Sequence, residues 1–500
     1  MYDFVIRNVR IVDGTGSPWR RGDVAVKDGK IAHVGFVPKD ESPEIDGEDR
    51  YLTPGFIDIH CHTDESVFRY PQVESRILQG VTTELAGNCG GSAAPVVNGE
   101  PGTFPTMKEF LDALDELHPS TNVAMLAGQG TIRAAVVGMD ERPATPEEME
   151  KMKALAARCM EEGAFGISSG LIYHPSCYAD TNELIELCKA IRPYDGFYAT
   201  HMRNEKQRLV EGVREALAIG AGAGVAVEIS HHKCTWKPDW EVSVNTTTAM
   251  IEKARSNGLD VTCDQYPYVA SSTGLSSNVP NWAFDGGTEK LLARLAAPES
   301  RERLRRECNE SHAGRWDTIY VTYTDCAEDA WMAGMNITSI AEKLGGKDPA
   351  LTVFDILLRS GNHAGEVSFS MCEEDVEYIM QKPYVMIGSD GWAYSMEKKG
   401  CPHPRSFAAF VRVLAHYSRD RKLFSLEEGI RKMTGAPAAK LGLDDRGVIK
   451  KGMWADLVLL DREELKDTPD YRDPFRACEG IRKVWVNGVL TAENGRHTGA

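Results

Sequence analysis

Short β-rich runs alternate with helical stretches through the middle of the chain, and this alternation limits the folds open to it. The helical patterns cover, for example, residues 146–162, 182–191 and 209–219. Strands that alternate with helices favour a parallel sheet, and eight such units predict an α/β fold, a (β/α)8 TIM-like barrel. The eight predicted strands lie at residues 56–60, 81–85, 123–126, 165–168, 197–201, 225–230, 260–264 and 385–388.

The two chain ends carry a different signal. Residues 1–53 and 441–500 contain apolar runs around the two-residue turns Asp28-Gly29 and Asn487-Gly488, which is a strong hairpin pattern. We therefore expect both ends to pair into a small β-sandwich, outside a barrel that occupies residues 54–440. The span 282–368 is too long for one strand-to-helix connection, and we predict that it forms an inserted lid after strand seven.

The composition restricts the partners of the chain. A net charge of -17 over 500 residues argues against nucleic acid or an anionic membrane as a partner. The first residues read as a strand, without a signal peptide, and no apolar run approaches the ~20 residues of a membrane span. The 12 cysteines are scattered, as is typical of reduced thiols. We expect a cytoplasmic protein whose partner is a small molecule.

Side chains that bind metals fall at the ends of the predicted strands. His60 and His62 are two residues apart, so they point to the same side of strand one. Cys89 follows strand two between glycines, His201 ends strand five, and Asp390 follows strand eight. In barrels of this type the carboxyl ends of the strands carry the active site. Histidine, cysteine and carboxylate ligands together favour zinc.

Strand six ends in two histidines, of which only one should face the barrel. We predict His231 as the ligand and His232 as a packing residue, because neighbours on a strand face opposite ways. Each of these signals alone has a plainer explanation: a lone histidine satisfied in the core, a buried thiol at Cys89, or a turn aspartate at Asp390. Their recurrence at five strand ends is what favours a metal site.

The motifs resemble the amidohydrolase superfamily, and within it the N-acyl-D-amino-acid deacylase (D-aminoacylase) family. The resemblance covers nearly the whole chain. It is carried by residues 53–62, Gly87-Asn88-Cys89-Gly90, His201-Met202-Arg203-Asn204-Glu205, Ser230-His231-His232-Lys233, Tyr266-Pro267-Tyr268, Ile387-Gly388-Ser389-Asp390-Gly391 and His403-Pro404-Arg405.

The resemblance implies a zinc-dependent enzyme with one or two Zn²⁺ ions per subunit. His60, His62 and Asp390 would hold one metal position. Cys89, His201 and His231 would hold a tighter one, with Cys89 as a bridge between the two. Asp390 would also be the catalytic residue that accepts a proton from water. Residues implied to bind the substrate carboxylate or to position the amide are Lys233, Arg405, Tyr173, Tyr266, Tyr268 and Ser272.

The implied reaction is hydrolysis of N-acyl-D-amino acids, which are small anions, to a D-amino acid and a carboxylate. The D preference comes only from the resemblance, which also leaves a homo-oligomer open. A cyclic amidase of the hydantoinase or dihydroorotase type is an alternative, although such enzymes usually carry a carboxylated lysine after strand four, where this sequence has Ser168-Ser169-Gly170. A non-catalytic amidohydrolase-like scaffold is a second alternative.

Overall fold

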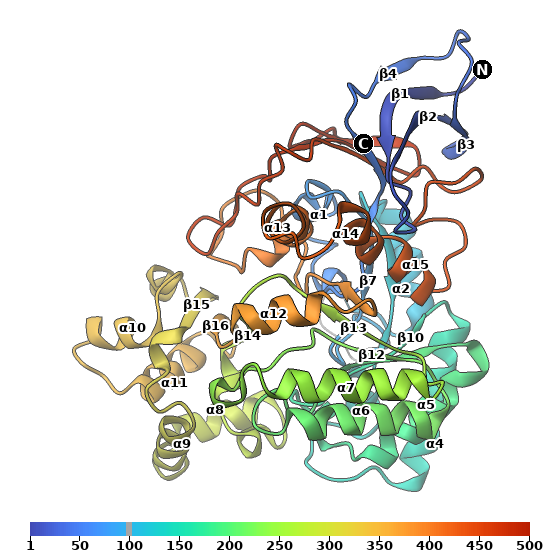
Figure 1. Ribbon diagram of the computed structural model, residues 1–500. Helices are drawn as coiled ribbons and strands as arrows, with labels where there is room; N and C mark the ends of the chain where they lie inside the picture. Colours follow the sequence, from blue (N-terminus) through green and yellow to red (C-terminus); the bar gives the residue numbers. More distant parts are fainter. Residues whose placement is uncertain (97–102) are drawn as a thin grey trace.

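The computed structural model describes residues 1–96 and 103–500, and within them eight parallel strands form a barrel (Figure 1). Two sheets make up the barrel wall. They are joined where β9 (Ala127–Gly128) continues β8 and where Cys61 bridges to Gly391. The (β/α)8 prediction is confirmed, with every predicted strand found within a few residues of its expected place. The strands are β6 (Phe56–Asp58), β7 (Val81–Ala86), β8 (Asn122–Met125), β10 (Gly166–Gly170), β11 (Phe197–His201), β12 (Val227–Ile229), β13 (Val261–Gln265) and β17 (Val385–Ile387).

Helices α4, α5, α6 and α7 lie side by side over one side of the barrel (Figure 1). Helix α4 (Pro146–Glu161) begins with a capping box, in which Thr145 and Glu148 satisfy each other's backbone donors, and with proline at its first position. Helix α6 (Leu209–Ala223) ends at Gly224, whose left-handed φ of +70° suits a residue without a Cβ. The other two are α5 (Thr181–Ile191) and α7 (Ser243–Ser256).

The remaining helices cover the other sides of the barrel and the approach to the terminal sheet. Helix α13 carries Arg405 at its first position. These helices are α1 (Glu74–Ile77), α2 (Met107–Leu117), α3 (Gln129–Val136), α12 (Glu373–Met380), α13 (Arg405–Arg412), α14 (Leu426–Met433) and α15 (Gly435–Lys440).

Both chain ends join one sheet, which counts nine strands over the described residues and lies above the barrel in Figure 1. The Asp28-Gly29 and Asn487-Gly488 turns each have two positive φ values, as type I′ hairpin turns require. The strands are β1 (Phe4–Ile11), β2 (Arg20–Lys27), β3 (Lys30–Gly35), β4 (Glu44–Asp46), β5 (Tyr51–Pro54), β18 (Leu457–Leu460), β19 (Ile481–Val486), β20 (Val489–Glu493) and β21 (Arg496–His497).

This terminal sheet curls onto itself. The rings of Phe4 in β1 and Trp485 in β19 stack with centroids 5.9 Å apart. In the sheet order β19-β18-β5-β1, a flat sheet would separate these two strands by roughly 14 Å. Curling buries Val24, Leu457 and Trp485 in one apolar core and gives the sandwich expected from the sequence.

A separate small unit lies between β13 and β17. Its antiparallel sheet has the order β14-β16-β15, with β16 central, so β14 (Ala270–Gly274) joins the insertion although it precedes residue 282. Leu291, Leu304 and Phe354 form part of its own apolar core. Its other elements are β15 (Ile319–Thr324), β16 (Ala364–Phe369), α8 (Thr288–Ala296), α9 (Pro298–Ser311), α10 (Ile337–Lys343) and α11 (Pro349–Arg359).

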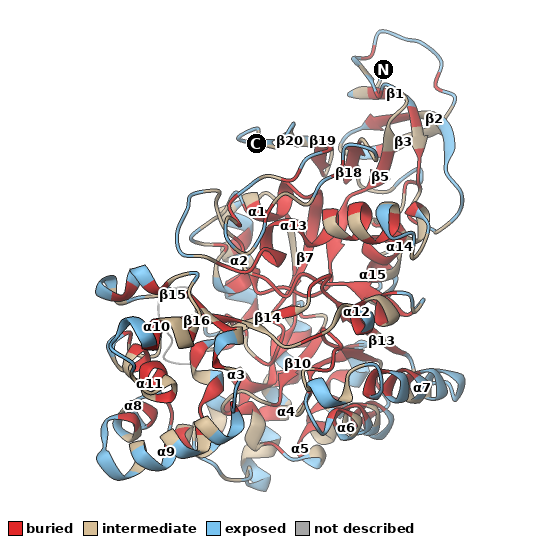
Figure 2. Ribbon diagram, turned by 60° about the vertical axis from the view of Figure 1, so that its left-hand side comes forward, coloured by how far each residue is buried: buried red, intermediate tan, exposed pale blue. Residues whose placement is uncertain are grey.

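Burial follows this architecture. The barrel strands are buried almost throughout, whereas the outer faces of α4 to α7 and of the insertion helices are exposed (Figure 2). Of the helices in the described part of the chain, none combines the length and apolar character needed to cross a bilayer. The loops that follow the barrel strands therefore begin from a buried core.

Candidate metal centre and active site

The predicted metal ligands converge at the carboxyl ends of the barrel strands. His60, His62, Cys89 and Asp390 offer ligand atoms that all lie within 4.8 Å of one another, and Cys89, His201 and His231 do the same. All of these side chains are buried. Cys89 belongs to both groups, so one thiolate stands between two adjoining sets of ligands.

The distances around Cys89 are short. Its Sγ lies 3.4 Å from Nε2 of His60, 3.5 Å from Nε2 of His231 and 3.8 Å from Nδ1 of His201. Oδ1 of Asp390 lies 3.1 Å from Nε2 of His62 and 3.4 Å from Nε2 of His60. Imidazole, thiolate and carboxylate are the donor set that zinc prefers, and the residues present fit such an ion.

The backbone places these ligands by unusual means. Cys89, His231 and Asp390 all have positive φ values, of 53°, 35° and 53°, in the region that non-glycine residues seldom adopt. Such conformations cluster at functional sites, where the surrounding structure holds them. The amide of Asp390 donates to the carbonyl of His60 at 2.7 Å, which joins the loop after β17 to the end of β6.

The loop that carries Cys89 packs directly on the end of β10. A Cβ atom at Gly170 would stand 2.0 Å from the carbonyl oxygen of Cys89, and one at Gly90 would stand 2.5 Å from the amide nitrogen of Gly170. Both positions must therefore be glycine. A lysine at position 170 has no room, because its Cβ would collide with the cysteine loop.

Two carboxylates that the sequence analysis did not assign lie behind the histidines. Asp264, at the end of β13, places Oδ2 3.1 Å from Nδ1 of His60 and accepts a hydrogen bond from the amide of His231 at 2.8 Å. Glu205 places Oε1 3.0 Å from Nδ1 of His231 and Oε2 3.5 Å from Nε2 of His201. Carboxylates in this position fix the tautomer and orientation of metal-binding histidines.

Both carboxylates left a signal in the sequence. Asp264 is the last residue of a predicted strand, and Glu205 is the last residue of the motif that begins at His201. Neither could be assigned, because their importance comes from the histidines they face across the barrel rather than from their neighbours in sequence.

The electrostatics favour ionised ligands. Burial alone would raise the pKa of Asp390, but Arg405 and the surrounding histidines hold that pKa well below its usual range. Burial would likewise raise the pKa of Cys89, whereas His60, His201 and His231 lower it well below that of a free thiol. The site therefore presents a carboxylate and a thiolate, the forms that bind a cation.

The side chains of the two histidines that end strand six point in different directions. His231 faces the cluster, while Nε2 of His232 lies 3.0 Å from Oγ1 of Thr247 in α7. Burial lowers the pKa of His232 to about 4, so it is a neutral packing residue.

Three of the predicted substrate-binding residues line the space beside the cluster. Nη1 of Arg405 lies 2.8 Å from Oδ2 of Asp390, and its Nη2 donates to the carbonyl of Ser272 at 2.9 Å. The Ser272 hydroxyl is already used, because it donates to the carbonyl of Glu366. Tyr173 reaches Oγ1 of Thr273 with its hydroxyl at 3.1 Å.

The other three predicted substrate residues are placed differently. Lys233 pairs with Glu205 at 2.7 Å and lies within reach of His231, so it is already engaged beside the cluster. Tyr266 lies against both Lys233 and Arg405 and, within the described residues, its buried hydroxyl has no hydrogen-bond partner. Tyr268 is not brought to the pocket: its ring packs under the guanidinium of Arg412, in the core beside the insertion.

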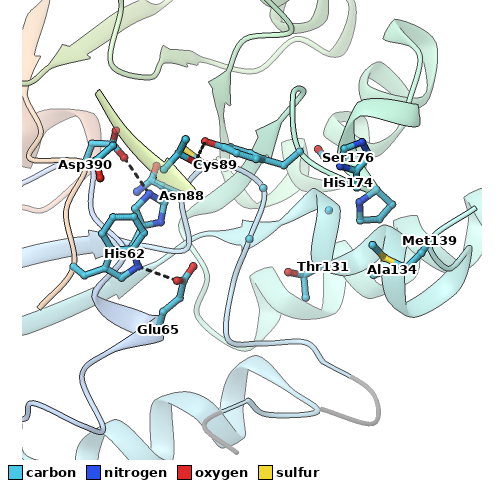
Figure 3. Close-up of a pocket in the computed structure, with 18 residues that line it drawn as sticks. His62, Glu65, Asn88, Cys89, Thr131, Ala134, Met139, His174, Ser176 and Asp390 are labelled. Atoms are coloured by element: carbon cyan, nitrogen blue, oxygen red, sulfur yellow. Dashed lines mark hydrogen bonds and ion pairs between the residues drawn. The ribbon is translucent and has the colours of Figure 1, made fainter. Parts of the chain in front are cut away.

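A pocket of about 380 Å³ opens beside the ligands. His62, Asn88, Cys89 and Asp390 lie together at one end, and Thr131, Ala134, Met139, His174 and Ser176 lie at the other (Figure 3). A second and wider pocket, of about 730 Å³, adjoins it and is lined by Arg405. The two share Ser272, Thr273, Glu65 and Trp392.

A third group of potential ligands lies deeper in the barrel and is already neutralised. Asp58, Cys61 and Glu84 come together there, but the buried guanidinium of Arg76 lies 3.0 Å from Glu84 and 3.6 Å from Asp58. Arg76 supplies the positive charge that a metal would otherwise bring. This cluster instead braces the site, since Asp58 also accepts hydrogen bonds from Ser389.

The comparisons with known proteins agree with the site. The sequence profile of the amidohydrolase family matches residues 43–234 and 310–492. D-aminoacylase from Alcaligenes xylosoxydans xylosoxydans is 35% identical, over 100% of this chain and 97% of that protein. N-acyl-D-aspartate deacylase from the same organism is 34% identical, over 100% of this chain and 93% of that protein. A crystal structure of N-acyl-D-glutamate deacylase from Bordetella bronchiseptica contains zinc and a phosphonate inhibitor. It matches this chain with a TM-score of 0.86 and 32% sequence identity, over 99% of this chain and 98% of that chain.

A parallel barrel with buried histidine, cysteine and aspartate ligands at its carboxyl end, matched by this profile, defines a metal-dependent amidohydrolase. Such enzymes cleave carbon–nitrogen bonds of amides. About a third of the residues are identical to those of the deacylases over the full length of the chain. The chain therefore belongs to the N-acyl-D-amino-acid deacylase (D-aminoacylase) family of that superfamily.

Proposed function

We propose that this chain is a zinc-dependent deacylase that hydrolyses N-acyl-D-amino acids to a D-amino acid and a carboxylate. The observation that carries the proposal is the pair of ligand groups that share Cys89. The substrate class is that of the relatives, which match over nearly all of their own length. His60, His62 and Asp390 would hold one zinc position, and His201 and His231 the other, with Cys89 at both.

When bound, zinc supplies Lewis-acid chemistry, which lowers the pKa of water toward neutrality and polarises a carbonyl group. Asp390 is the proposed catalytic residue, because it is ionised and buried among the ligands. It takes a proton from the water that attacks the amide carbon and returns the proton to the leaving nitrogen, so it acts first as base and then as acid.

Arg405 is the proposed partner of the substrate α-carboxylate, since a guanidinium binds a carboxylate through two parallel hydrogen bonds. In this way a chain of net charge -17 can attract an anion to one local cation. The hydroxyl of Tyr266 lies beside Arg405 and has no hydrogen-bond partner in the described part of the chain, so it can donate a further hydrogen bond to the substrate. Lys233 would act mainly by holding Glu205 and His231 in place.

The geometry disfavours a cyclic amidase that depends on a carboxylated lysine after strand four. The Cys89 carbonyl would stand 2.0 Å from a Cβ at Gly170, so the cysteine loop leaves no room for a lysine at the last residue of strand four. Cys89 supplies the negative charge in its stead.

The test is a comparison of N-acetyl-D-methionine with N-acetyl-L-methionine and with hydantoins, using protein of measured zinc content. We expect turnover of the D substrate, and an Asp390→Asn variant that retains zinc but loses at least about a hundredfold in kcat. Zinc-loaded protein that cleaves only hydantoins, or an Asp390→Asn variant of undiminished activity, would contradict the proposal.

A further inference from the structure

The pocket beside the ligands is uncharged at the end farthest from them. That end is formed by Thr131 and Ala134 of α3, Met139 in the loop after α3, and His174 in the loop after β10 (Figure 3). Among the described residues that line the pocket, none is lysine or arginine. The sequence of residues 97–102 contains no lysine or arginine either.

The insertion supports this far wall. The ring of Phe284 stacks on His174 with centroids 4.1 Å apart, and the amide of Gly286 donates to the carbonyl of Met139 at 3.2 Å. Burial lowers the pKa of His174 to about 4, so the imidazole is neutral at physiological pH. The far wall thus offers apolar and neutral polar surface that is held in place from behind.

Among the described residues that line the pocket, Glu65 and Asp390 are acidic, and Glu65 strengthens the selection. Glu65 accepts a hydrogen bond from Nε1 of Trp392 at 2.9 Å, and the Trp392 ring stacks on His62. This carboxylate is fixed on the pocket wall beside the ligand cluster. A second carboxylate that entered the same pocket would be repelled and would find no cation at the far end.

The route from the proposed carboxylate site leads into this pocket. Arg405 donates to the carbonyl of Ser272, and the neighbouring Thr273 bonds to the hydroxyl of Tyr173. Ser272 and Thr273 line both pockets, and Tyr173 lines the one beside the ligands. A Cα attached to a carboxylate at Arg405 would lie near the junction of the two pockets, from which the pocket beside the ligands extends to Tyr173 and Met139.

Resting on the proposed function, we infer that the enzyme selects N-acyl amino acids with an uncharged side chain and excludes those of aspartate and glutamate. The far end of the pocket receives that side chain, while the acyl group lies elsewhere. Sequence identity does not make this distinction, because the relatives at 35% and 34% identity are a D-aminoacylase and an N-acyl-D-aspartate deacylase.

The experiment varies each end of the substrate separately in zinc-loaded enzyme. We expect kcat/KM for N-acetyl-D-methionine and N-acetyl-D-leucine to exceed that for N-acetyl-D-aspartate and N-acetyl-D-glutamate by at least about tenfold. In Met139→Arg the ratio should shift toward the acidic substrates by at least about tenfold. The ratio of N-acetyl- to N-hexanoyl-D-methionine should stay as in the wild type.

Asp140→Asn is the matched control, because it changes the net charge by the same amount at an exposed neighbour that does not line the pocket. If Met139→Arg fails to fold by circular dichroism, Ala134→Arg places a cation in the same pocket from an exposed position on α3. Either arginine variant serves the same comparison.

Wild-type enzyme that prefers the acidic substrates, or arginine variants that change only the acyl-length preference, would overturn the inference. Calorimetric binding of the same N-acetyl amino acids to the Asp390→Asn variant measures selection without turnover. Failure of every N-acyl-D-amino acid to be cleaved would refute the proposed function, whereas the binding series would still decide which side chains the pocket admits.

Discussion

Oδ2 of Asp264 lies 3.1 Å from Nδ1 of His60, although 204 residues separate the two in sequence. Both side chains are fully buried, and the contact directs Nε2 of His60 toward Cys89 and Asp390. Gly388 leaves just enough room, since a Cβ there would stand 3.0 Å from the Asp264 carboxylate and 2.5 Å from His60. Asp264 is a positioning residue for this ligand.

Replacing Asp264 with asparagine should weaken zinc binding by about 10- to 100-fold, because the histidine loses the acceptor that fixes its tautomer. Zinc affinity measured by competition with a chelating dye checks this directly. Glu228→Gln is the control: Glu228 is buried near Asp264, and burial raises its pKa to about 8, so glutamine mimics its protonated form. Equal zinc affinity in Asp264→Asn and the wild type would refute the role.

Gly170→Ala should remove both metal and activity although glycine is not a ligand. The new Cβ would meet the Cys89 carbonyl at 2.0 Å, so the cysteine loop must move. Zinc content by elemental analysis and kcat/KM are the measurements. Gly274→Ala is the control, because its nearest neighbour would be a serine hydroxyl oxygen at 3.8 Å. A fully active, zinc-replete Gly170→Ala would show that the loop does not depend on this contact.

Removal of metal should abolish turnover and lower the apparent melting temperature. A ligand that binds only the folded chain stabilises it, by about 4 kcal/mol when present at a thousandfold excess over its Kd. Calorimetric melting of chelator-treated protein, before and after zinc is restored, tests both effects. A melting curve that zinc leaves unchanged would argue against binding at the buried ligands.

The insertion should lose stability as pH rises, through Glu366. Burial raises the pKa of this carboxyl from 4.5 to about 7, although hydrogen bonds from Asn278 and Ser277 oppose the rise. Because the folded pKa exceeds the unfolded one, the destabilisation is absent below pH 4.5 and grows as pH rises through 7, to about 3 kcal/mol.

Glutamine mimics the protonated form, so the melting temperature of Glu366→Gln relative to the wild type should increase from pH 5 to pH 8. The exposed Glu289 on α8 provides the control substitution, Glu289→Gln. A difference between Glu366→Gln and the wild type that stays constant over this pH range would contradict the expected ionisation.

Much of the fold could be predicted because its signals are local. Strand periodicity located all eight barrel strands, and the Asp28-Gly29 and Asn487-Gly488 turns marked two hairpins. The first apolar residues of the chain form one strand, β1, whose register against β2 shifts between Ile6 and Val9. The addition of β14 to the insertion could not be anticipated, because its pairing partner β16 lies about ninety residues further along the chain.

The sequence alone determined the strand order and the strand ends that carry His60, His62, Cys89, His201, His231 and Asp390, because both depend on patterns among near neighbours. Only the tertiary structure decided that Asp264 and Glu205 stand behind these histidines, that Tyr268 turns into the core, and that a neutral wall ends the pocket. Those facts depend on closure of the barrel, which brings together loops that are far apart in sequence. No pattern among neighbouring residues predicts which of these loops meet.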